Sequence, residues 1–328
     1  MENQDFKWGI IGTGGIAKAF ANDLAYAKNH AVAAVGSRAN ASAQKFASQY
    51  SGCKGYGNYL QLVEDPDIDG VYVATPHNYH REHTIMALNA GKPVLCEKPF
   101  AINENEVRSM VETAKIAKLT LMEAMWTRYL PHIAKVKEIL ASGILGEIYT
   151  LHADFGQLLT ENNNPRLWEP SLAGGALLDM GIYPVSFSHM VFGKPSSIIA
   201  QASFTKKGID AQTSAVFKYH NGAQSIISAS SHNQTPCSAH ISGFNGFLEL
   251  DYLFYCPTNM RVVLYDGLKK EYPNAYKGHG LREQAIEFAR CVQSNEIESP
   301  LLTHNESIAV MKSMDQIRKQ IGLRYPNE

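Results

Sequence analysis

The sequence lacks the features that would place the protein at a membrane or on a nucleic acid. No apolar run approaches the roughly 20 residues that a membrane-spanning helix needs. The N-terminal residues Met1–Asp5 lack the basic flank and the apolar stretch of a signal peptide. Basic and acidic residues nearly balance, at 30 and 31, and no long block of one sign occurs. We therefore expect a cytoplasmic protein whose partners include neither a membrane nor a nucleic acid.

Signals for disulfides and metals are missing as well. The five cysteines are an odd number, widely spaced and without a Cys-x-x-Cys pair, which is typical of reduced and mostly buried thiols. His77, His80 and His83 lie three residues apart, but the Asn, Tyr, Arg and Glu between them leave no carboxylate or thiolate partner at ligand spacing. The sequence therefore predicts no metal site.

A chain of 328 residues is long for one hydrophobic core, so two domains are expected. In its first third, short apolar segments alternate with amphipathic ones, which predicts parallel strands joined by right-handed helical crossovers. The expected strands are 6–11, 31–36, 70–74, 93–97 and 119–124, and the expected helices are 16–27, 41–50, 81–90 and 104–118. Residues 1–125 are therefore predicted to form an α/β domain with a doubly wound parallel sheet.

The pattern changes near Trp126. The turn His220-Asn221-Gly222 is typical of a hairpin, and apolar residues at helical spacing from Leu281 and from Ile308 predict two C-terminal helices. A helix is expected over 133–142, and strands are expected over 148–156, 197–206, 214–219, 223–231 and 247–250. We therefore predict a second domain over residues 126–328, of the α+β class, with a large and mostly antiparallel sheet.

A Gly-x-Gly-x-x-Ala motif at residues 12–17 follows the first expected strand directly. The first glycine permits a sharp turn, the second lets the backbone approach a pyrophosphate, and the small third residue lets helix and strand pack closely. The helix N-terminus then presents unpaired N–H groups to the phosphates. This context predicts a dinucleotide site at the turn residues Gly12, Thr13, Gly14, Gly15 and Ile16.

The identity of the dinucleotide follows from an absence, because no acidic residue occurs between Asp23 and Glu64. An NAD site of this kind usually has an acid at the end of the second strand, where it binds the ribose 2′-hydroxyl. Here that strand is followed by Ser37 and Arg38, a hydroxyl and a guanidinium suited to a 2′-phosphate. We therefore predict NADP in preference to NAD.

Lys98, Asp179 and Tyr183 are the candidate catalytic residues. Moving a hydride from a secondary alcohol requires the hydroxyl proton to leave as well, so a general base is needed. A free tyrosine has a pKa of about 10, and a neighbouring ammonium stabilises its phenolate while polarising the substrate oxygen. Asp179 could orient a sugar-like hydroxyl or keep Lys98 charged. Among 16 tyrosines, composition gives Tyr183 no privilege, and its motif does.

The motifs around these residues resemble those of the Gfo/Idh/MocA oxidoreductases, the glucose–fructose oxidoreductase and inositol dehydrogenase type, along essentially the whole chain. The matching segments are Gly9–Gly14, Ala74–His80, Glu97–Pro99 and Gly174–Pro184. Many members carry histidine where this chain has Tyr183. That departure, together with Met122–Arg128 and Gln320–Pro326, is similar to the branch of dimeric dihydrodiol dehydrogenases and NADP-dependent D-xylose dehydrogenases.

The resemblance implies a Rossmann domain, an open-faced antiparallel sheet that often forms a homodimer, and a cis bond between Lys98 and Pro99. It also implies that Tyr183 is the acid/base, that Lys98 lowers its pKa, and that Trp126 and Phe155 line the substrate pocket with Asp179 and Tyr183. The implied cofactor contacts beyond the glycine turn are Thr75, Pro76, His77, His80, Glu97 and Lys98.

Two functions remain open. The first is an NADP(H)-dependent oxidoreductase acting on a sugar, polyol or cyclic trans-diol, and the second is a non-catalytic dinucleotide-binding sensor or regulator on the same fold. Fold alone does not decide between them. Retention of Lys98, Asp179 and Tyr183 together favours the enzyme, since a sensor has no use for that set. No role is assigned to Arg128, Arg166 or Trp168.

Overall fold

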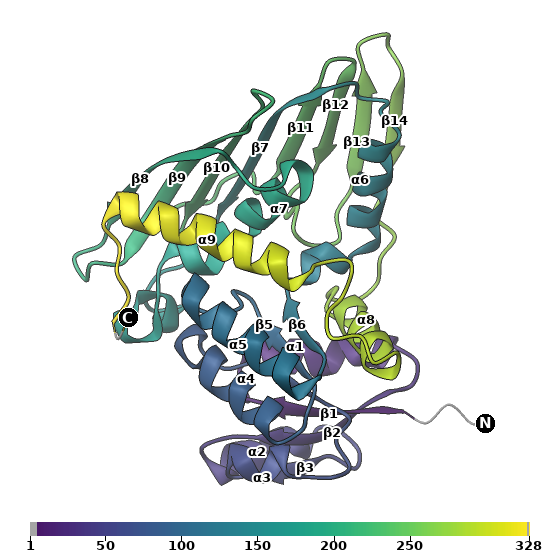
Figure 1. The fold of residues 1–328 in the computed structure, drawn as a ribbon, viewed down its shortest axis with the longest axis vertical. Helices are drawn as coiled ribbons and strands as arrows, with labels where there is room; N and C mark the ends of the chain where they lie inside the picture. Colours follow the sequence, from purple (N-terminus) through teal and green to yellow (C-terminus); the bar gives the residue numbers. More distant parts are fainter. Residues whose placement is uncertain (1–4, 327) are drawn as a thin grey trace. The chain divides into compact units, whose positions relative to one another are not determined.

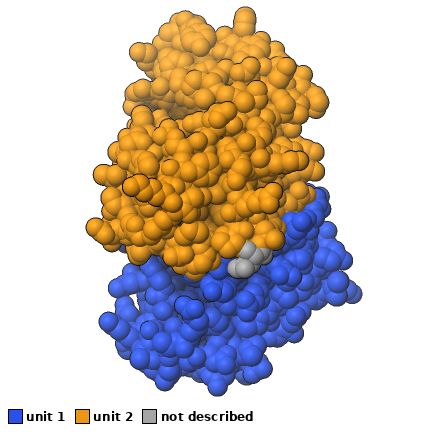
Figure 2. Space-filling model, turned by 90° about the vertical axis from the view of Figure 1, so that its left-hand side faces the viewer, with its two compact units in different colours: residues 1–101, 105–129, 277–307 blue, residues 102–104, 130–276, 308–328 orange. Residues whose placement is uncertain are grey.

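The fold in Figure 1 is that of a computed structural model, which describes residues 5–326 and residue 328. The chain forms two compact units, shown in different colours in Figure 2. Unit 1 runs to Ala101 and adds Asn105–Tyr129 and Lys277–Ser307. Unit 2 contains Ile102–Glu104, Leu130–Tyr276 and the chain from Ile308 onward. The predicted division into a cofactor domain and a substrate domain near residue 125 stays a prediction.

Unit 1 contains a six-stranded sheet with the order β3-β2-β1-β4-β5-β6, in which every neighbouring pair is parallel. Its strands are β1 (Phe6–Ile11), β2 (His30–Gly36), β3 (Lys54–Tyr56), β4 (Gly70–Val73), β5 (Val94–Glu97) and β6 (Leu121–Ala124). Its helices are α1 (Gly15–Asp23), α2 (Asn40–Ala47), α3 (Tyr59–Val63), α4 (His80–Asn89), α5 (Glu104–Ala117) and α8 (Arg282–Gln293). The predicted doubly wound parallel sheet is confirmed, with its topological switch point between β1 and β4, where such folds bind ligands.

The core of unit 1 is aromatic and includes a residue from far along the chain. Trp8 on β1 packs edge-on against Phe20 on α1, with 5.1 Å between ring centroids, and Phe20 stacks on Tyr72 of β4 at 3.8 Å. Phe288 on α8 lies 5.1 Å from Trp8. All four side chains are fully buried, and each such burial contributes about 1.5–3 kcal/mol to folding. Burial of Phe288 therefore anchors α8 in unit 1.

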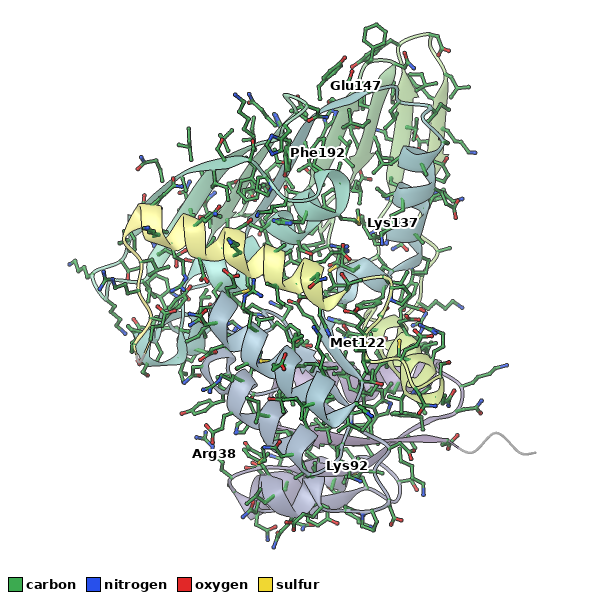
Figure 3. All side chains as sticks on the ribbon, in the orientation of Figure 1. Arg38, Lys92, Met122, Lys137, Glu147 and Phe192 are labelled. Atoms are coloured by element: carbon green, nitrogen blue, oxygen red, sulfur yellow. The ribbon has the colours of Figure 1, made fainter. Side chains whose placement is uncertain are left out.

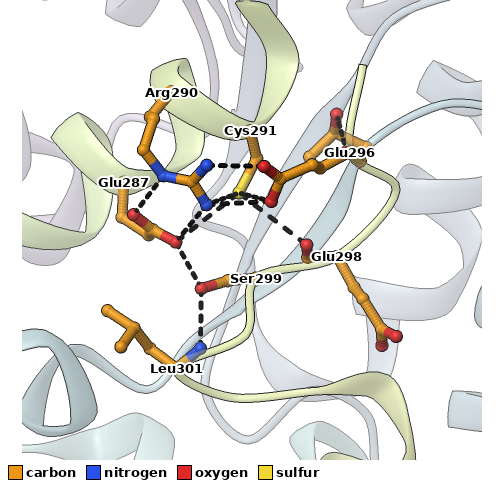
Figure 4. A network of polar contacts seen from close by, with 8 residues as sticks. Glu287, Arg290, Cys291, Glu296, Glu298, Ser299 and Leu301 are labelled. Atoms are coloured by element: carbon orange, nitrogen blue, oxygen red, sulfur yellow. Dashed lines mark hydrogen bonds and ion pairs between the residues drawn. The ribbon is translucent and has the colours of Figure 1, made fainter. Parts of the chain in front are cut away.

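The segment after α8 covers the edge of the parallel sheet. Leu121 of β6 donates its backbone N–H to the carbonyl of Ile297, so this segment satisfies part of the edge strand's hydrogen bonding. Arg290 fixes the segment, because its guanidinium binds Glu287 on one side and Glu296 on the other (Figure 4). The network holds the chain beside β6 where it would otherwise leave an unpaired strand.

Unit 2 is built on an eight-stranded sheet with the order β14-β13-β12-β11-β7-β10-β9-β8. Among the described strands of this sheet, only the pair of β7 and β10 is parallel, so the predicted mostly antiparallel sheet is confirmed. The strands are β7 (Ile148–Gly156), β8 (Ser197–Phe204), β9 (Asp210–Lys218), β10 (Gln224–Ser230), β11 (Ala239–Gly243), β12 (Gly246–Leu250), β13 (Met260–Leu264) and β14 (Lys269–Tyr272). The predicted hairpin at His220–Gly222 joins β9 to β10, with Gly222 at φ +86°.

Within the described residues of unit 2, helices cover one face of this sheet and leave the other open. Helices α6 (Pro131–Ala141), α7 (Ile182–Phe192) and the part of α9 (His304–Ile321) from residue 308 lie on the same face (Figure 1). Gln320 on α9 pairs with the backbone of β8, accepting from Ala200 and donating to Ile198. Across the open face, register partners form a continuous row: Ile199, Val216, Ile226, His152, His240, Glu249 and Arg261.

Two local expectations, the cis bond at Pro99 and the free cysteines, can be compared with the structure. The bond between Lys98 and Pro99 is cis, as the family resemblance implies. All five cysteines are free, and Cys96, Cys237 and Cys291 are buried, as expected of reduced thiols. Within the described residues, no helix combines the length and the apolarity that crossing a bilayer demands.

Candidate functional site

The glycine turn of unit 1 leaves the N-terminus of α1 open to a ligand. Gly12 adopts φ +109°, and a Cβ atom at this position would stand 2.7 Å from the carbonyl oxygen of Ala74. Among the described residues other than their immediate chain neighbours, none has a heavy atom within 4 Å of a Cβ added at Gly14 or Gly15. Gly14 is the N-cap of α1 and provides no side-chain cap. The free N–H groups and the positive end of the helix therefore suit a phosphate, as predicted for this turn.

The two glycines give a matched pair of tests. Gly12→Ala is expected to lower the free energy of unfolding by about 2–4 kcal/mol, because alanine disfavours positive φ and its Cβ meets a carbonyl. Gly14→Ala should leave stability within about 1 kcal/mol of wild type, because its Cβ enters open space, and should instead weaken dinucleotide binding. Urea unfolding and a fluorescence titration with NADP measure the two effects. Equal destabilisation by both substitutions would contradict this description of the turn.

A hollow of about 270 Å³ lies beyond the carboxyl ends of β2 and β4. Arg38, labelled in Figure 3, lines it together with Tyr59, Thr75, Pro76, Tyr79, Glu82 and His83. His83 Nδ1 lies 3.0 Å from Thr75 Oγ1. Burial lowers the pKa of His83. The Glu82 carboxylate raises this pKa and the Arg38 cation lowers it, and the net shift is downward, so the imidazole is uncharged at neutral pH. The hollow thus offers one guanidinium and several aromatic faces, which suit a phosphorylated ribose and a base.

Ser37 directly precedes Arg38 and is buried. Its hydroxyl oxygen accepts a hydrogen bond of 3.4 Å from the backbone N–H of Ala39. Tyr59 and His83 were not predicted to belong to the site, whereas Tyr79 lies in the segment Ala74–His80 that resembles the family motif. Tyr79 stacks on His83 with 5.7 Å between ring centroids, and Tyr59 meets His83 edge-on at 4.8 Å. Tyr59 and His83 lie outside the motif segments, so only the fold brings these two side chains to Arg38.

His80 connects the loop after β4 with the segment around Lys98. Its Nε2 lies 2.8 Å from the carbonyl oxygen of Thr75, and its Nδ1 lies 2.8 Å from that of Pro99. His77 meets it edge-on at 5.6 Å. Within the described part of the chain, no group of three or more histidine, cysteine or acidic side chains could hold a metal ion. His80 thus ties together two segments that were both predicted to contact the cofactor.

Two buried carboxylates fix the backbone on either side of Lys98. Glu97 accepts a hydrogen bond from the Tyr72 hydroxyl and a second one, of 3.2 Å, from the backbone N–H of Lys98. Glu123 on β6 accepts from the N–H of Phe100 at 3.2 Å. Burial raises the pKa of Glu123, although its hydrogen bonds oppose that effect. Lys98 therefore stands on a stretch of chain held at both ends by side chains from neighbouring strands.

Trp126 follows β6 and is buried in unit 1, where it stacks on His279 with 5.3 Å between ring centroids. The loop that carries His279 is held by Asp23 at the end of α1. The carboxylate of Asp23 accepts from the backbone N–H groups of His279, Gly280 and Arg282 at 2.6, 3.0 and 2.9 Å. One face of the Trp126 indole is therefore occupied by a fixed imidazole, a contact that the sequence did not predict.

In unit 2, Asp179 and Tyr183 lie on one continuous helical stretch. Asp179 is in a single turn of π-helix, Leu177–Gly181, which leads directly into α7 with Tyr183 in its first turn. The Tyr183 ring lies 5.5 Å from Phe155 of β7 and 4.6 Å from Tyr255, and Phe155 stacks on Tyr255 at 4.2 Å. The structure thus brings the predicted residues Phe155 and Tyr183 together and adds Tyr255, which no sequence pattern singled out.

Arg166 pairs with Asp179. Its guanidinium donates to Asp179 Oδ1 at 3.0 Å from the short turn Pro165–Trp168. That turn packs closely on the motif glycines, because a Cβ on Gly174 would stand 2.4 Å from the carbonyl oxygen of Leu167. The other unassigned arginine, Arg128, is buried in unit 1 and binds Glu306 at 2.7 Å. Arg166 therefore belongs beside the predicted site residues, and Arg128 has a structural partner.

The two halves of the chain match two models of one family. Residues 6–125 match the oxidoreductase family with an NAD-binding Rossmann fold, and residues 133–249 match the GFO/IDH/MocA C-terminal domain. The chain belongs to the GFO/IDH/MocA oxidoreductases. This GFO/IDH/MocA protein is 35% identical to D-xylose 1-dehydrogenase (NADP(+)) of Hypocrea jecorina, over 98% of this chain and 93% of that enzyme. It is also 34% identical to human trans-1,2-dihydrobenzene-1,2-diol dehydrogenase, over 98% of both chains.

Solved structures of other oxidoreductases share the whole fold. An aldose–aldose oxidoreductase from Caulobacter crescentus, complexed with glycerol, superposes with a TM-score of 0.87 at 23% identity and covers 97% of each chain. A 3-ketoreductase from Actinomadura kijaniata, in complex with NADP and TDP-benzene, superposes with a TM-score of 0.85 at 25% identity, covering 97% of this chain and 98% of that one. This family member is therefore an oxidoreductase with a Rossmann unit and an open-sheet unit, as the sequence predicts.

Proposed function

We propose that the chain is an NADP(H)-dependent oxidoreductase that moves a hydride between the nicotinamide and a sugar, a polyol or a cyclic trans-diol. The observation that carries the proposal is the retention of Lys98, Asp179 and Tyr183 in a chain similar to a D-xylose dehydrogenase and a dihydrodiol dehydrogenase along 98% of its length. Both relatives are named for the oxidation of a carbon that bears a hydroxyl group. We therefore expect the substrate to be a compound with hydroxyl groups on neighbouring carbons.

The residues present fit NADP. The open N-terminus of α1 suits the pyrophosphate, and the hollow at Arg38 suits the 2′-phosphate and the adenosine. NADP supplies the carbon that accepts or returns the hydride. We assign to cofactor binding the turn, the end of β2, the loop after β4 and the segment at Lys98, that is Gly12, Thr13, Gly14, Gly15, Ile16, Ser37, Arg38, Thr75, Pro76, His77, His80, Glu97 and Lys98.

The proton is assigned to Tyr183. Its phenolate removes the hydroxyl proton during oxidation and becomes the phenol, which returns the proton during reduction, while the Lys98 ammonium stabilises the phenolate and polarises the reacting oxygen. Asp179, held by Arg166, accepts a hydrogen bond from a substrate hydroxyl next to the reacting carbon. Trp126 and Phe155 provide flat apolar surfaces suited to a sugar ring or a cyclohexadiene ring. This division of roles requires no metal ion.

A turnover screen tests the proposal. The purified chain is mixed with NADP or NAD and with D-xylose, other aldoses, inositols and a trans-dihydrodiol, and NADPH or NADH is detected by near-ultraviolet absorbance. We expect NADPH to form with one compound class and much less NADH with the same compound. Tight NADP binding without turnover of any aldose, polyol or diol would favour the alternative, a dinucleotide-binding sensor.

We also propose that residues 1–125 act as the cofactor domain and that residues 126–328 hold the substrate and form a homodimer through the open sheet face. Three neighbouring apolar side chains on that face, Ile199, Val216 and Ile226, have exposed fractions of 68%, 38% and 41% in the single chain. An exposed apolar patch of this kind is typical of a surface that binds another protein chain. Light scattering is expected to give the mass of two chains, and Ile226→Asp should give the mass of one. A wild-type monomer at micromolar concentration would contradict the dimer.

A further inference from the structure

Asp210, at the start of β9, is a buried carboxylate with no role so far. Its side chain is fully buried. Oδ2 accepts a hydrogen bond of 2.6 Å from the backbone N–H of Leu177 and one of 3.0 Å from the hydroxyl of Thr213. Burying a carboxylate is costly unless hydrogen bonds compensate. A side chain of this kind therefore needs an explanation beyond packing.

The surrounding chain is shaped to admit this carboxylate. Gly175 adopts φ +127°, and a Cβ atom there would stand 2.1 Å from Asp210 Oδ1. Any residue other than glycine would therefore collide with the carboxylate and would also be strained by its backbone conformation. The two motif glycines thus have different neighbours in unit 2: Gly174 lies against the carbonyl of Leu167, and Gly175 lies against Asp210.

The hydrogen bond to Leu177 acts on the stretch that carries the proposed chemistry. Leu177 is the first residue of the π-helical turn that ends at Gly181, and the leading N–H groups of a helix have no partner within it. A negative charge is favoured at this end of a helix. Asp179 lies two residues further on and Tyr183 lies six residues further on. A π-turn contains one residue more than a turn of α-helix, so it changes the direction in which the following side chains point from the helix axis. A contact that fixes the first residue of the π-turn therefore also fixes these directions.

We propose that Asp210 is a positioning residue, which fixes the first N–H of this turn and thereby orients Asp179 and Tyr183. The inference rests on the proposed function, because Tyr183 is assigned its proton there. Asp210 does not touch substrate or cofactor in this account, and it acts through the helix. Loss of its carboxylate releases the Leu177 N–H and lets the turn adopt the ordinary α-helical register, which moves the phenol and the carboxylate that follow.

The charge of Asp210 changes near neutral pH. Burial raises its pKa to about 7, against the opposing hydrogen bonds from Leu177 and Thr213. Tyr325 faces it from the C-terminal segment, and burial, with Asp210 as the next cause, raises the pKa of that phenol well above its ordinary value, so Tyr325 stays neutral here. Above pH 7 the ionised carboxylate holds the Leu177 N–H more strongly. Because the folded pKa exceeds the ordinary 3.8, the stability that this group contributes is full below pH 3.8 and is lost as pH rises through 7.

Three variants of the full chain test the proposal, namely Asp210→Asn, Asp210→Ala and Tyr183→Phe. Asparagine keeps an oxygen for the Leu177 N–H but cannot ionise, whereas alanine removes the acceptor. We expect kcat to fall about 10- to 100-fold in Asp210→Ala and less than about fivefold in Asp210→Asn, with the Kd for NADP unchanged in both. A step near pH 7 in the kcat profile should be absent from Asp210→Asn. An unchanged kcat in folded Asp210→Ala, or an Asp210→Asn profile that keeps the step, would overturn the proposal.

A second readout does not depend on activity. In protein labelled with ¹⁵N-leucine, the Leu177 amide proton should shift with a midpoint near pH 7 in wild type and stay constant in Asp210→Asn. Identical titration of this amide in both proteins would overturn the assignment, even where Asp210→Ala fails to fold. Full turnover by Tyr183→Phe would remove the proposed function, while the amide titration would still report the hold of Asp210 on the helix.

Discussion

Replacing Tyr183 with phenylalanine is expected to lower kcat by about 10³-fold or more while the Kd for NADP stays within about twofold of wild type. The phenol supplies the proton transfer that accompanies hydride transfer, and phenylalanine keeps the ring that packs on Phe155 and Tyr255. Steady-state turnover and a fluorescence titration with NADP measure the two quantities. Retained turnover would remove Tyr183 from the mechanism.

Tyr255→Phe is the matched control for this experiment. Tyr255 stacks in the same aromatic cluster, and its hydroxyl accepts a hydrogen bond from Gln157 at 3.1 Å. It has no assigned proton to move, so the substitution should cost less than about tenfold in kcat. In the same assay, Lys98→Met should abolish turnover or raise the pH optimum, because the phenolate of Tyr183 then loses its ammonium partner. An unaltered pH profile would count against that role of Lys98.

Arg38→Ala is expected to weaken binding of NADP by about 10- to 100-fold and to leave binding of NAD nearly unchanged. A charge-assisted hydrogen bond contributes about 1.5–3 kcal/mol, and only NADP carries the 2′-phosphate that would receive it. Arg81→Ala is the control, because Arg81 lies on α4, donates to Ser109 and does not line the Arg38 hollow. Calorimetric titration with both dinucleotides measures the difference. Equal losses for NADP and NAD would refute the 2′-phosphate assignment.

The sequence predicts the elements whose physical signal is local. The strand, glycine turn and helix from Phe6 to Asp23 carry an apolar run, a motif and a helical period in order, and the structure has all three. The hairpin at His220–Gly222 is set by its own turn residues. The preference for NADP likewise follows from a local feature, because no acidic residue occurs between Asp23 and Glu64.

Other elements could not be predicted because their signal is not periodic or not local. Helix α7 is buried from Ile182 through His189, so it has no polar face to reveal a helical period. Strands β3 and β14 are short, and β14 has the charged sequence Lys269–Tyr272. The assignment of α8 to unit 1 depends on Phe288 reaching Trp8, a contact across 280 positions of the chain that a one-dimensional pattern does not contain.

The same limit applies to the site. Tyr183 was found through a motif, but Tyr255, which packs on it, lies far along the chain in a segment without one. Arg166 carried no assignment from the sequence because its ion pair with Asp179 depends on how a short turn packs on Gly174. Motifs therefore located the residues assigned to the chemistry, and only the fold identified the side chains that hold them.

Transfer of deuterium distinguishes a hydride-transferring enzyme from a dinucleotide-binding sensor. A substrate from the active class, deuterated at the carbon that bears the reacting hydroxyl, is incubated with the enzyme and NADP, and the nicotinamide is analysed by NMR and mass spectrometry. We expect the deuterium to appear on the nicotinamide ring of the reduced cofactor, and Tyr183→Phe to suppress its appearance. Substrate consumption without deuterium on the nicotinamide, or firm NADP binding with no transfer from any sugar, polyol or diol, would contradict the account.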